Sequence, residues 1–340
     1  MARIGLVVNP AAGRDIRRLT GGASVTDNYA KRRVAECVLS GLNVTDDPPS
    51  VTIMPDRSGI SDHLIDEASK TVDVEALDIP ITQSAEDTQR AGERFREEAD
   101  CIVVLGGDGT TRDMALECGD VPLVSVATGT NTVVPTAIDG TVAGAAAALL
   151  ATGCVSLDET TIDHGMVEAV ADTTNGEKRL KGLATLGVLD VEFVGTRAIL
   201  DAESVVGGVV SRAFPSEIGL SGLAGALATH RPEEPGGVGF RLGPADETSQ
   251  TVRAITVPGV VDRFGVSEWR ELDSEESMTF ELSSGVLSID GERELELQNS
   301  IVEIRPVDDG PRLVDIERVF AAGTAEGVFT EDSTRFHEER

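Results

Sequence analysis

The chain has 340 residues, of which 40% are hydrophobic, and its 59 acidic residues against 29 basic ones give a formal net charge of −30. This length allows two domains, and this hydrophobic fraction excludes a disordered chain. The shortage of basic residues excludes sequence-independent nucleic-acid binding, which depends on lysine and arginine neutralising phosphates. We expect a halophilic protein in a salt-rich cytoplasm, because salt screens repulsion between like charges; an acidic surface made for a basic partner is the alternative.

The cysteines favour a reducing compartment, and the hydropathy of the chain favours a protein that does not cross a membrane. The four cysteines lie far apart without a Cys-x-x-Cys pair, so we expect them to be reduced. No run of 18 apolar residues occurs, and the chain opens on a predicted strand at 4–8 instead of a signal peptide. We therefore expect a cytoplasmic protein that binds no membrane, with a homo-oligomer left open.

Through the first half of the chain, short apolar runs alternate with helical patterns. Strands are predicted at 4–8, 50–54, 76–81, 102–105 and 123–127, and helices at 28–39, 60–70, 85–98 and 111–118. The third helix opens with a Ser-Ala-Glu-Asp capping-box pattern at 84–87. This alternation predicts an α/β fold with a Rossmann-like parallel sheet and helices on both faces, in a nucleotide-binding domain over residues 1–150.

Near residue 150 the pattern changes to short strands joined by Gly, Ser and Asp. The pair Asn175-Gly176 favours a hairpin turn between strands at 167–171 and 179–186. Further strands are predicted at 188–193, 252–257, 278–282, 286–289 and 301–305, with a helix at 216–229. The sequence therefore predicts a β-rich, antiparallel domain over 151–325 and a polar tail over 326–340.

The most informative stretch is the string Gly-Gly-Asp-Gly-Thr at 106–110, which follows a buried strand and precedes a helical pattern. Glycines let the backbone approach a phosphate closely, and free N–H groups at a helix start favour an anion. A carboxylate repels phosphate, so Asp108 is a candidate Mg²⁺ ligand or a base that deprotonates a hydroxyl. The alternative is a plain strand-to-helix turn whose aspartate caps the helix. Arg112 excludes a Gly-x-Gly-x-x-Gly dinucleotide turn, and no P-loop motif occurs.

The string at 106–110 resembles a turn shared by a known superfamily, the NAD kinases with the diacylglycerol and sphingosine kinases, which carry Gly-Gly-Asp-Gly-Thr at this place. Within it the chain looks similar to the AcoX-type, NAD-kinase-like branch. The matching blocks follow one another in the same order at 8–18, 23–28, 106–112, 128–135, 141–144 and 289–294. The resemblance implies an NAD kinase/diacylglycerol kinase-like fold with its ligand in the cleft between the two domains.

The resemblance also implies which residues form the site. The candidates for binding a nucleotide are Asn9, Gly13, Gly106, Gly107, Gly109, Thr110, Gly129, Thr130 and Asn131. The string Asp-Gly-Glu at 290–292 matches acidic residues of the lipid-kinase active site, so the catalytic candidates are Asp108, Asp290 and Glu292. A hairpin turn is the alternative reading of 290–292. The arginines that remain open as phosphate partners, cleft residues or solvated surface residues are Arg14, Arg17, Arg18, Arg197 and Arg212.

The activity implied is that of a kinase that uses ATP or polyphosphate and Mg²⁺ to phosphorylate the adenosine 2′-hydroxyl of NAD, giving NADP. One departure from NAD kinases leaves the acceptor open, because the Asn-Glu or Asn-Asp pair that they carry after the glycine turn occurs nowhere in this chain. The alternatives are a kinase of lipids or other small alcohols, and a nucleotide-binding regulatory protein without turnover. In each case the partner is a small molecule.

Overall fold

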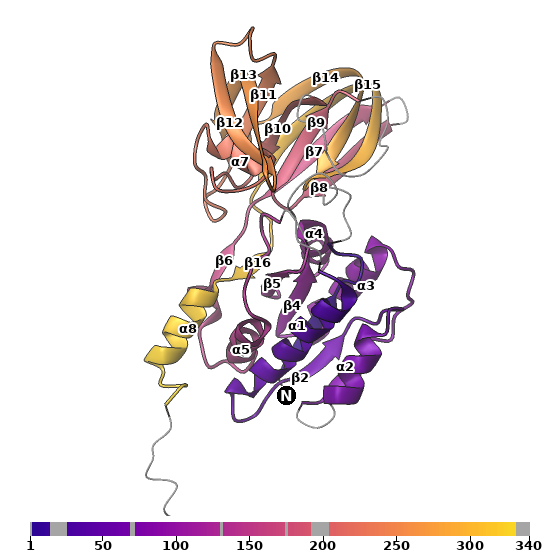
Figure 1. The fold of residues 1–340 in the computed structure, drawn as a ribbon, viewed down its shortest axis with the longest axis vertical. Coiled ribbons are helices and arrows are strands. Elements are labelled where there is room, and N and C mark those ends of the chain that lie inside the picture. Colours follow the sequence, from indigo (N-terminus) through magenta and orange to yellow (C-terminus); the bar gives the residue numbers. More distant parts are fainter. Residues whose placement is uncertain are drawn as a thin grey trace, which may run out of the picture.

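The computed structural model describes residues 2–13, 26–68, 72–129, 132–173, 176–191 and 204–330. The described chain forms an α/β part, lower in Figure 1, and a β-rich part above it. The helices are α1 (Asn28–Gly41), the 3₁₀ turn η2 (Leu42–Val44), α2 (Ile60–Ala68), α3 (Ala85–Glu98), α4 (Asp108–Ala115), α5 (Gly140–Ala151), α6 (Leu157–Thr160), α7 (Leu220–Gly225) and α8 (Ile316–Ala325). None of them combines the length and apolarity needed to cross a membrane.

The α/β part contains a seven-stranded sheet in the order β3-β2-β1-β4-β5-β16-β6. Its strands are β1 (Arg3–Val8), β2 (Ser50–Ile53), β3 (Val74–Ala76), β4 (Cys101–Gly106), β5 (Leu123–Ala127), β6 (Thr161–Asp163) and β16 (Arg312–Val314). The first five are parallel to one another, and β6 alone pairs antiparallel, with β16. The predicted α/β class is therefore confirmed.

Successive residues of the central strands point to two different cores, because helices cover both faces of this sheet. Leu6 and Leu105 belong to the core under α1, α2 and α5. Val7 and Val104 belong to the opposite core, where Phe95 of α3 and Met114 of α4 pack. Burial on both faces explains why these strands read as continuous apolar runs in the sequence.

Helices α1 and α5 pack so closely that a side chain would not fit between them. A Cβ on Gly144 of α5 would lie 2.0 Å from the carbonyl oxygen of Val38 in α1. This contact needs the glycine and lets the backbones of α1 and α5 touch. The Ala- and Gly-rich stretch that contains Gly144 is thus a core helix of the α/β part.

The β-rich part is one nine-stranded sheet in the order β12-β13-β11-β10-β9-β14-β15-β7-β8, and all of its pairings are antiparallel. Its strands are β7 (Met166–Thr173), β8 (Gly176–Gly182), β9 (Thr185–Leu189), β10 (Val205–Val210), β11 (Gly237–Gly243), β12 (Gln250–Val257), β13 (Val260–Leu272), β14 (Met278–Ile289) and β15 (Glu292–Val307). The prediction of a β-rich antiparallel part is confirmed.

Several local predictions differ from the structure for identifiable reasons. The strand predicted at 76–81 lies instead at Val74–Ala76, because its partner β2 ends at Ile53, which pairs with Ala76. The helix predicted at 216–229 shrinks to α7. Strands β10 and β11 were not predicted, because their glycines weaken a strand pattern, and β13, which has one glycine, was not predicted either. The glycine is required at Gly207, where a Cβ would lie 2.5 Å from the carbonyl oxygen of Phe240.

The chain passes twice between the two parts, once between β6 and β7 and again between β15 and β16. The segment predicted as β-rich, 151–325, therefore also contributes β6, β16 and α8 to the α/β part. The two crossings lie against each other: the His164 N–H donates to the carbonyl oxygen of Pro311 at 3.0 Å. A Cβ on Gly310 would lie 1.8 Å from the carbonyl oxygen of His164.

Candidate functional site

Three loops meet at the carboxyl ends of β1, β4 and β5, which are neighbours in the sheet. The Asn9 side chain donates from Nδ2 to Oγ1 of Thr110 at 2.7 Å, so the loop after β1 is joined to the loop after β4. The N–H groups of Thr128 and Gly129 donate to the carbonyl oxygen of Gly106 at 2.9 and 3.1 Å. The predicted convergence of these loops is present in the fold, at the edge where parallel α/β sheets bind ligands.

The glycines of the 106–110 string have different roles. Gly106 is buried in β4, where a Cβ would lie 2.6 Å from Cβ of Thr110, so this glycine allows the turn to close. A Cβ on Gly129 would lie 3.1 Å from Cα of Gly107, so these two loops touch. Gly109 has open space where its side chain would be, and it lines the large cavity. Gly107 and Gly109 therefore leave their backbone accessible to a ligand.

Asp108 is the first residue of α4, and its carboxylate holds the loop that follows β5. Oδ1 accepts the N–H of Val134 at 2.8 Å, and Oδ2 accepts the N–H of Val133 at 2.9 Å. Its side chain is buried but still lines the cavity. Asp108 thus fixes a loop of the site and also presents its carboxyl group to the cavity.

Asp290 has a similar role in the β-rich part. Its carboxylate accepts the N–H groups of Leu183, Ala184 and Thr185 at 2.9, 2.8 and 3.1 Å. Its φ of +48° is the left-handed conformation expected of a turn, followed by Gly291 at φ +82°. The turn predicted at 290–292 is present, and Asp290 and Glu292 also line the large cavity.

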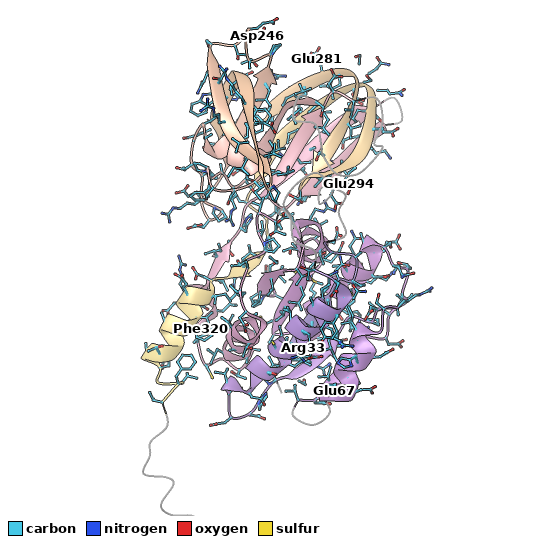
Figure 2. The ribbon with its side chains drawn as sticks, in the orientation of Figure 1. Arg33, Glu67, Asp246, Glu281, Glu294 and Phe320 are labelled. Carbon is cyan, nitrogen blue, oxygen red and sulfur yellow. The ribbon has the colours of Figure 1, made fainter. Side chains whose placement is uncertain are left out.

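Arg112 was not predicted as a site residue, although it connects the two parts of the molecule. It lies on α4, one turn after Asp108, and its guanidinium is 3.7 Å from Oδ2 of Asp290 and 4.0 Å from Oε1 of Glu294. It also donates to Oδ1 of Asp113 at 3.2 Å. Figure 2 shows Glu294 at the edge of the β-rich part that faces the α/β part. The only sequence signal for this bridge was the match that extended to residue 112.

The carboxyl group of Asp113, next to Arg112 in the chain, has a raised pKa. Burial raises the pKa of the Asp113 carboxyl to about 6, against the opposing effect of Arg112, and the charges of Glu294 and Glu292 raise it further. Burial lowers the pKa of Arg112, but the combined attraction of Asp290, Asp113 and Glu294 outweighs that effect and raises it. Asp113 therefore titrates near neutral pH beside the cavity.

The loop after β1 is held from below by a lysine. Lys31 of α1 is fully buried, and its ammonium donates to the carbonyl oxygens of Pro10 at 2.8 Å and Ala12 at 2.5 Å. Above them, the Ala11 N–H donates to Oδ1 of Asn9 at 2.8 Å. Gly13 closes the loop with a φ of +72°. Sequence reasoning missed Lys31, since a lone lysine in a helix reads as a surface residue.

The loops after β1, β4 and β5 and the turn at 290–292 line one cavity of about 1110 Å³, large enough for a nucleotide. Eight acidic residues and two arginines are among its lining residues. The acidic ones are Asp56, Glu86, Asp87, Asp108, Asp113, Asp290, Glu292 and Glu294.

Several of these carboxylates cap backbone N–H groups. Asp56 accepts from the N–H of Ser61 at 2.8 Å at the start of α2. The capping-box prediction at 84–87 was wrong in detail: Ser84 makes no side-chain capping bond, and Asp87 instead accepts the N–H groups of Thr82 and Gln83. Carboxylates in the cavity lining thus also hold the backbone of the loops that carry them.

Some predicted residues cannot be placed. Those that lie outside the described residues are Thr130, Asn131, Arg14, Arg17, Arg18, Asn175, Arg197 and the tail over 331–340. Arg212 is described, and it forms an ion pair with Glu217 away from the cavity lining.

Within the described part of the chain, no group of three or more His, Cys, Asp or Glu side chains is arranged to hold a metal ion. Magnesium is commonly held by one or two carboxylates together with substrate phosphates and water, and Asp108 is a carboxylate that lines the cavity.

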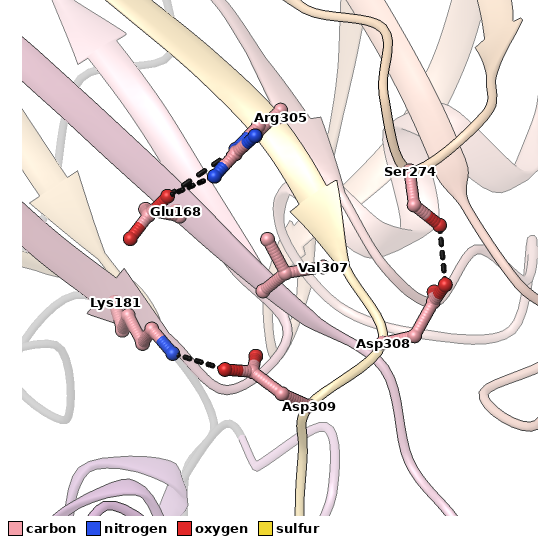
Figure 3. A pocket seen from close by; sticks show the side chains of 7 residues that line it. All are labelled: Glu168, Lys181, Ser274, Arg305, Val307, Asp308 and Asp309. Carbon is pink, nitrogen blue, oxygen red and sulfur yellow. Dashed lines mark hydrogen bonds and ion pairs between the residues drawn. The ribbon is translucent and has the colours of Figure 1, made fainter.

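A second cavity, of about 410 Å³, lies beside β7, β8 and the end of β15. Its charged groups are paired with one another: Arg305 donates to Glu168 at 2.8 Å, and Lys181 donates to Asp309 at 2.5 Å. Figure 3 shows these pairs, with Ser274 bound to Asp308. Because its charged side chains bind one another, we do not assign a ligand to this second cavity.

Comparisons with known proteins agree with this arrangement. Residues 4–153 match the ATP-NAD kinase N-terminal domain, and residues 166–309 match the Acetoin catabolism protein X C-terminal domain. The chain is similar to Acetoin catabolism protein X of Cupriavidus necator, with 32% identity over 308 residues, which cover 86% of this chain and 84% of that protein.

The fold is also similar to that of solved structures. The yeast NADH kinase complexed with NADH aligns with a TM-score of 0.52 and 11% identity, covering 98% of this chain and 89% of that chain. A putative diacylglycerol kinase from Bacillus anthracis str. Sterne aligns with a TM-score of 0.45 and 14% identity, covering 92% and 97%. At 11% identity the likeness to the yeast NADH kinase concerns the fold alone.

Proposed function

The chain belongs to the acetoin catabolism protein X family, and from this premise and the cavity we propose that it is a phosphotransferase that transfers the γ-phosphoryl group of ATP to an alcohol. The observation that carries the proposal is the meeting of the loops after β1, β4 and β5 at one cavity, closed on its other side by Asp290 and Glu292. We propose NAD as the acceptor, through its adenosine 2′-hydroxyl.

In the proposed reaction the acceptor oxygen forms a bond to the γ-phosphorus, the bond from that phosphorus to the bridging oxygen of ADP breaks, and the acceptor proton passes to a carboxylate. Such a reaction depends mainly on positioning and on stabilising charge. We assign the phosphates of the MgATP substrate to Asn9, Gly13, Gly107, Gly109 and Gly129, with Thr110 supporting Asn9. Thr130 and Asn131 remain proposed members of this set.

We assign the acceptor proton to Asp108, whose ionised carboxylate is held at the start of α4 beside the glycine loop. Glu292 faces the same cavity and is assigned to the hydroxyls of the acceptor. The three backbone N–H groups on Asp290 support a role in shaping the loop. Arg112 is expected to keep the loops of both parts at a fixed separation.

The deciding experiment incubates the purified chain with ATP, Mg²⁺ and NAD at 0.1 M and at molar KCl, and measures NADP with an NADP-specific enzymatic assay. We expect NADP formation without any need for lipid vesicles. Parallel reactions with γ-labelled ATP contain diacylglycerol vesicles or a sugar alcohol in place of NAD. Label transfer to one of those acceptors without any to NAD would retain the phosphotransferase and refute NAD. Binding of ATP without transfer to any acceptor would refute turnover.

A further inference from the structure

Lys31 is a buried cation placed directly beneath the loop over residues 9–13. Among the described residues it is the only lysine or arginine with none of its surface exposed. Its ammonium reaches the carbonyl oxygens of Pro10 and Ala12, both of which belong to residues lining the cavity. Because the side chain is fully covered, it acts on a ligand only through this loop.

The two hydrogen bonds determine which way the loop peptides face. The described chain has no cis peptide bond, and in a trans peptide the N–H points away from the C=O. The carbonyl of Ala12 points to Lys31, so the N–H of Gly13 in the same peptide unit points to the opposite side. Gly13 lines the cavity and has the positive φ that brings the chain around at this point.

The charge of the cavity explains why this orientation matters. Its lining has eight acidic residues and two arginines, which makes it a poor place for a polyphosphate. Two carbonyl oxygens turned toward the ligand would make the potential more negative. Lys31 turns them away and adds a positive charge behind the loop, where low solvent access preserves its effect.

We propose that Lys31 is a positioning residue that converts the 9–13 loop into a binding site for the phosphates of a nucleoside triphosphate. This inference rests on the proposed function for the identity of the ligand. It assigns to Lys31 the orientation of the loop and a through-space charge, and no contact with the reacting atoms.

The experiment measures binding by calorimetry to the full chain, with adenosine, AMP, ADP, ATP and inorganic tripolyphosphate as probes. The variant Lys31→Met keeps the length of the side chain but removes its charge and donors. We expect ATP and tripolyphosphate to bind about 10- to 100-fold more weakly, because the loop loses both the orientation of its peptides and the charge behind it. The loss should increase with the number of phosphates and be absent for adenosine.

Two further variants make the result specific. Val38→Ala shortens a buried side chain of the same helix away from the loop, so it should lower the melting temperature without changing the ATP dissociation constant. Lys31→Gln keeps N–H donors without the charge, and we expect an intermediate loss. It also replaces Lys31→Met if that variant does not fold. In the unaltered chain, tripolyphosphate should shift the amide resonance of Gly13.

Each outcome is decisive for Lys31. Unchanged ATP binding in Lys31→Met, an equal loss for adenosine and ATP, or a wild-type chain that binds no tripolyphosphate would overturn the proposal. Phosphate-dependent loss of binding in a chain that transfers phosphate to no acceptor would support the role of Lys31 and refute the proposed function.

Discussion

Arg112 and Asp290 come from different parts of the molecule, and their charged groups lie 3.7 Å apart between α4 and the end of β14. The side chains are 11% and 1% exposed. Arg112 follows the glycine string that opens α4, and Asp290 holds the amides of residues 183–185. This pair therefore connects the proposed phosphate loop to the acidic turn on the other side of the cavity.

Replacing Arg112 by methionine should destabilise the protein strongly, because it leaves Asp113, Asp290 and Glu294 close together without their cation. Breaking a buried ion pair in this way costs about 3–5 kcal/mol. Urea unfolding monitored by circular dichroism measures the change. Arg305→Met is the matched control: its partner is Glu168, but its side chain is 45% exposed, so we expect a cost of about 1 kcal/mol or less. Equal losses in the two variants would contradict the bridge.

Replacing Asp108 by asparagine should reduce the proposed activity by about 100-fold or more, since the ionised carboxylate is lost. The variant should also be less stable, because an amide cannot accept the N–H groups of Val133 and Val134 as a carboxylate does. Turnover at saturating substrates and the melting temperature are measured together.

The control for that variant is Asp139→Ala, which removes the side-chain cap of α5 outside the cavity lining. It should lower the melting temperature without a comparable loss of turnover. Near-normal turnover in Asp108→Asn would remove Asp108 from the chemistry.

Asp113 should make stability fall as pH rises. Its pKa is raised from 3.8 to about 6 in the folded protein, chiefly by burial. Between these two pH values the folded state therefore holds a proton that the unfolded state has released. The stabilisation is complete below about pH 4 and is lost as pH rises through about 6, and it is worth up to roughly 3 kcal/mol. The unfolding free energy of wild type minus that of Asp113→Asn should decrease between pH 4 and pH 7. A constant difference would contradict the raised pKa.

His164 should have the opposite effect. Burial lowers its pKa from 6.5 to about 4, so the folded protein holds it neutral, and the unfolded chain takes up the proton first on acidification. The stabilisation is present above pH 6.5 and is lost as pH falls toward 4. In His164→Asn, with an amide near the position of Nδ1, stability should depend less on pH across this window. Thermal unfolding at half-unit pH steps measures it, and parallel curves for both proteins would contradict the assignment.

Salt should stabilise the fold, because the formal net charge is −30. Raising KCl from about 0.1 to 2 M shortens the Debye length from about 10 Å to below 3 Å, which removes repulsion between exposed carboxylates. We expect the melting temperature to rise steeply over this range. A flat curve would contradict a halophilic origin of the acidic surface.

The sequence by itself determined the alternating strands and helices of the first half of the chain and the positions of its glycine-rich and acidic turns. The apolar runs of β1 and β4, the helix at 85–98 and the glycine string could be predicted from their residues, because periodicity and turn chemistry are local. The same local reasoning identified Asp108 and Asp290 as acidic residues at turns. It also predicted that strands alternating with helices give way to short antiparallel strands near residue 150.

Only the tertiary structure decided how these pieces act together. Lys31 is separated from Ala12 by 19 residues and Arg112 from Asp290 by 178, so no local pattern predicts either contact. The return of β16 and α8 to the first sheet also depends on pairing between distant strands. Such contacts follow from packing across the whole chain, and packing decides which carboxylates hold loops, which cation is buried and which charges share a cavity.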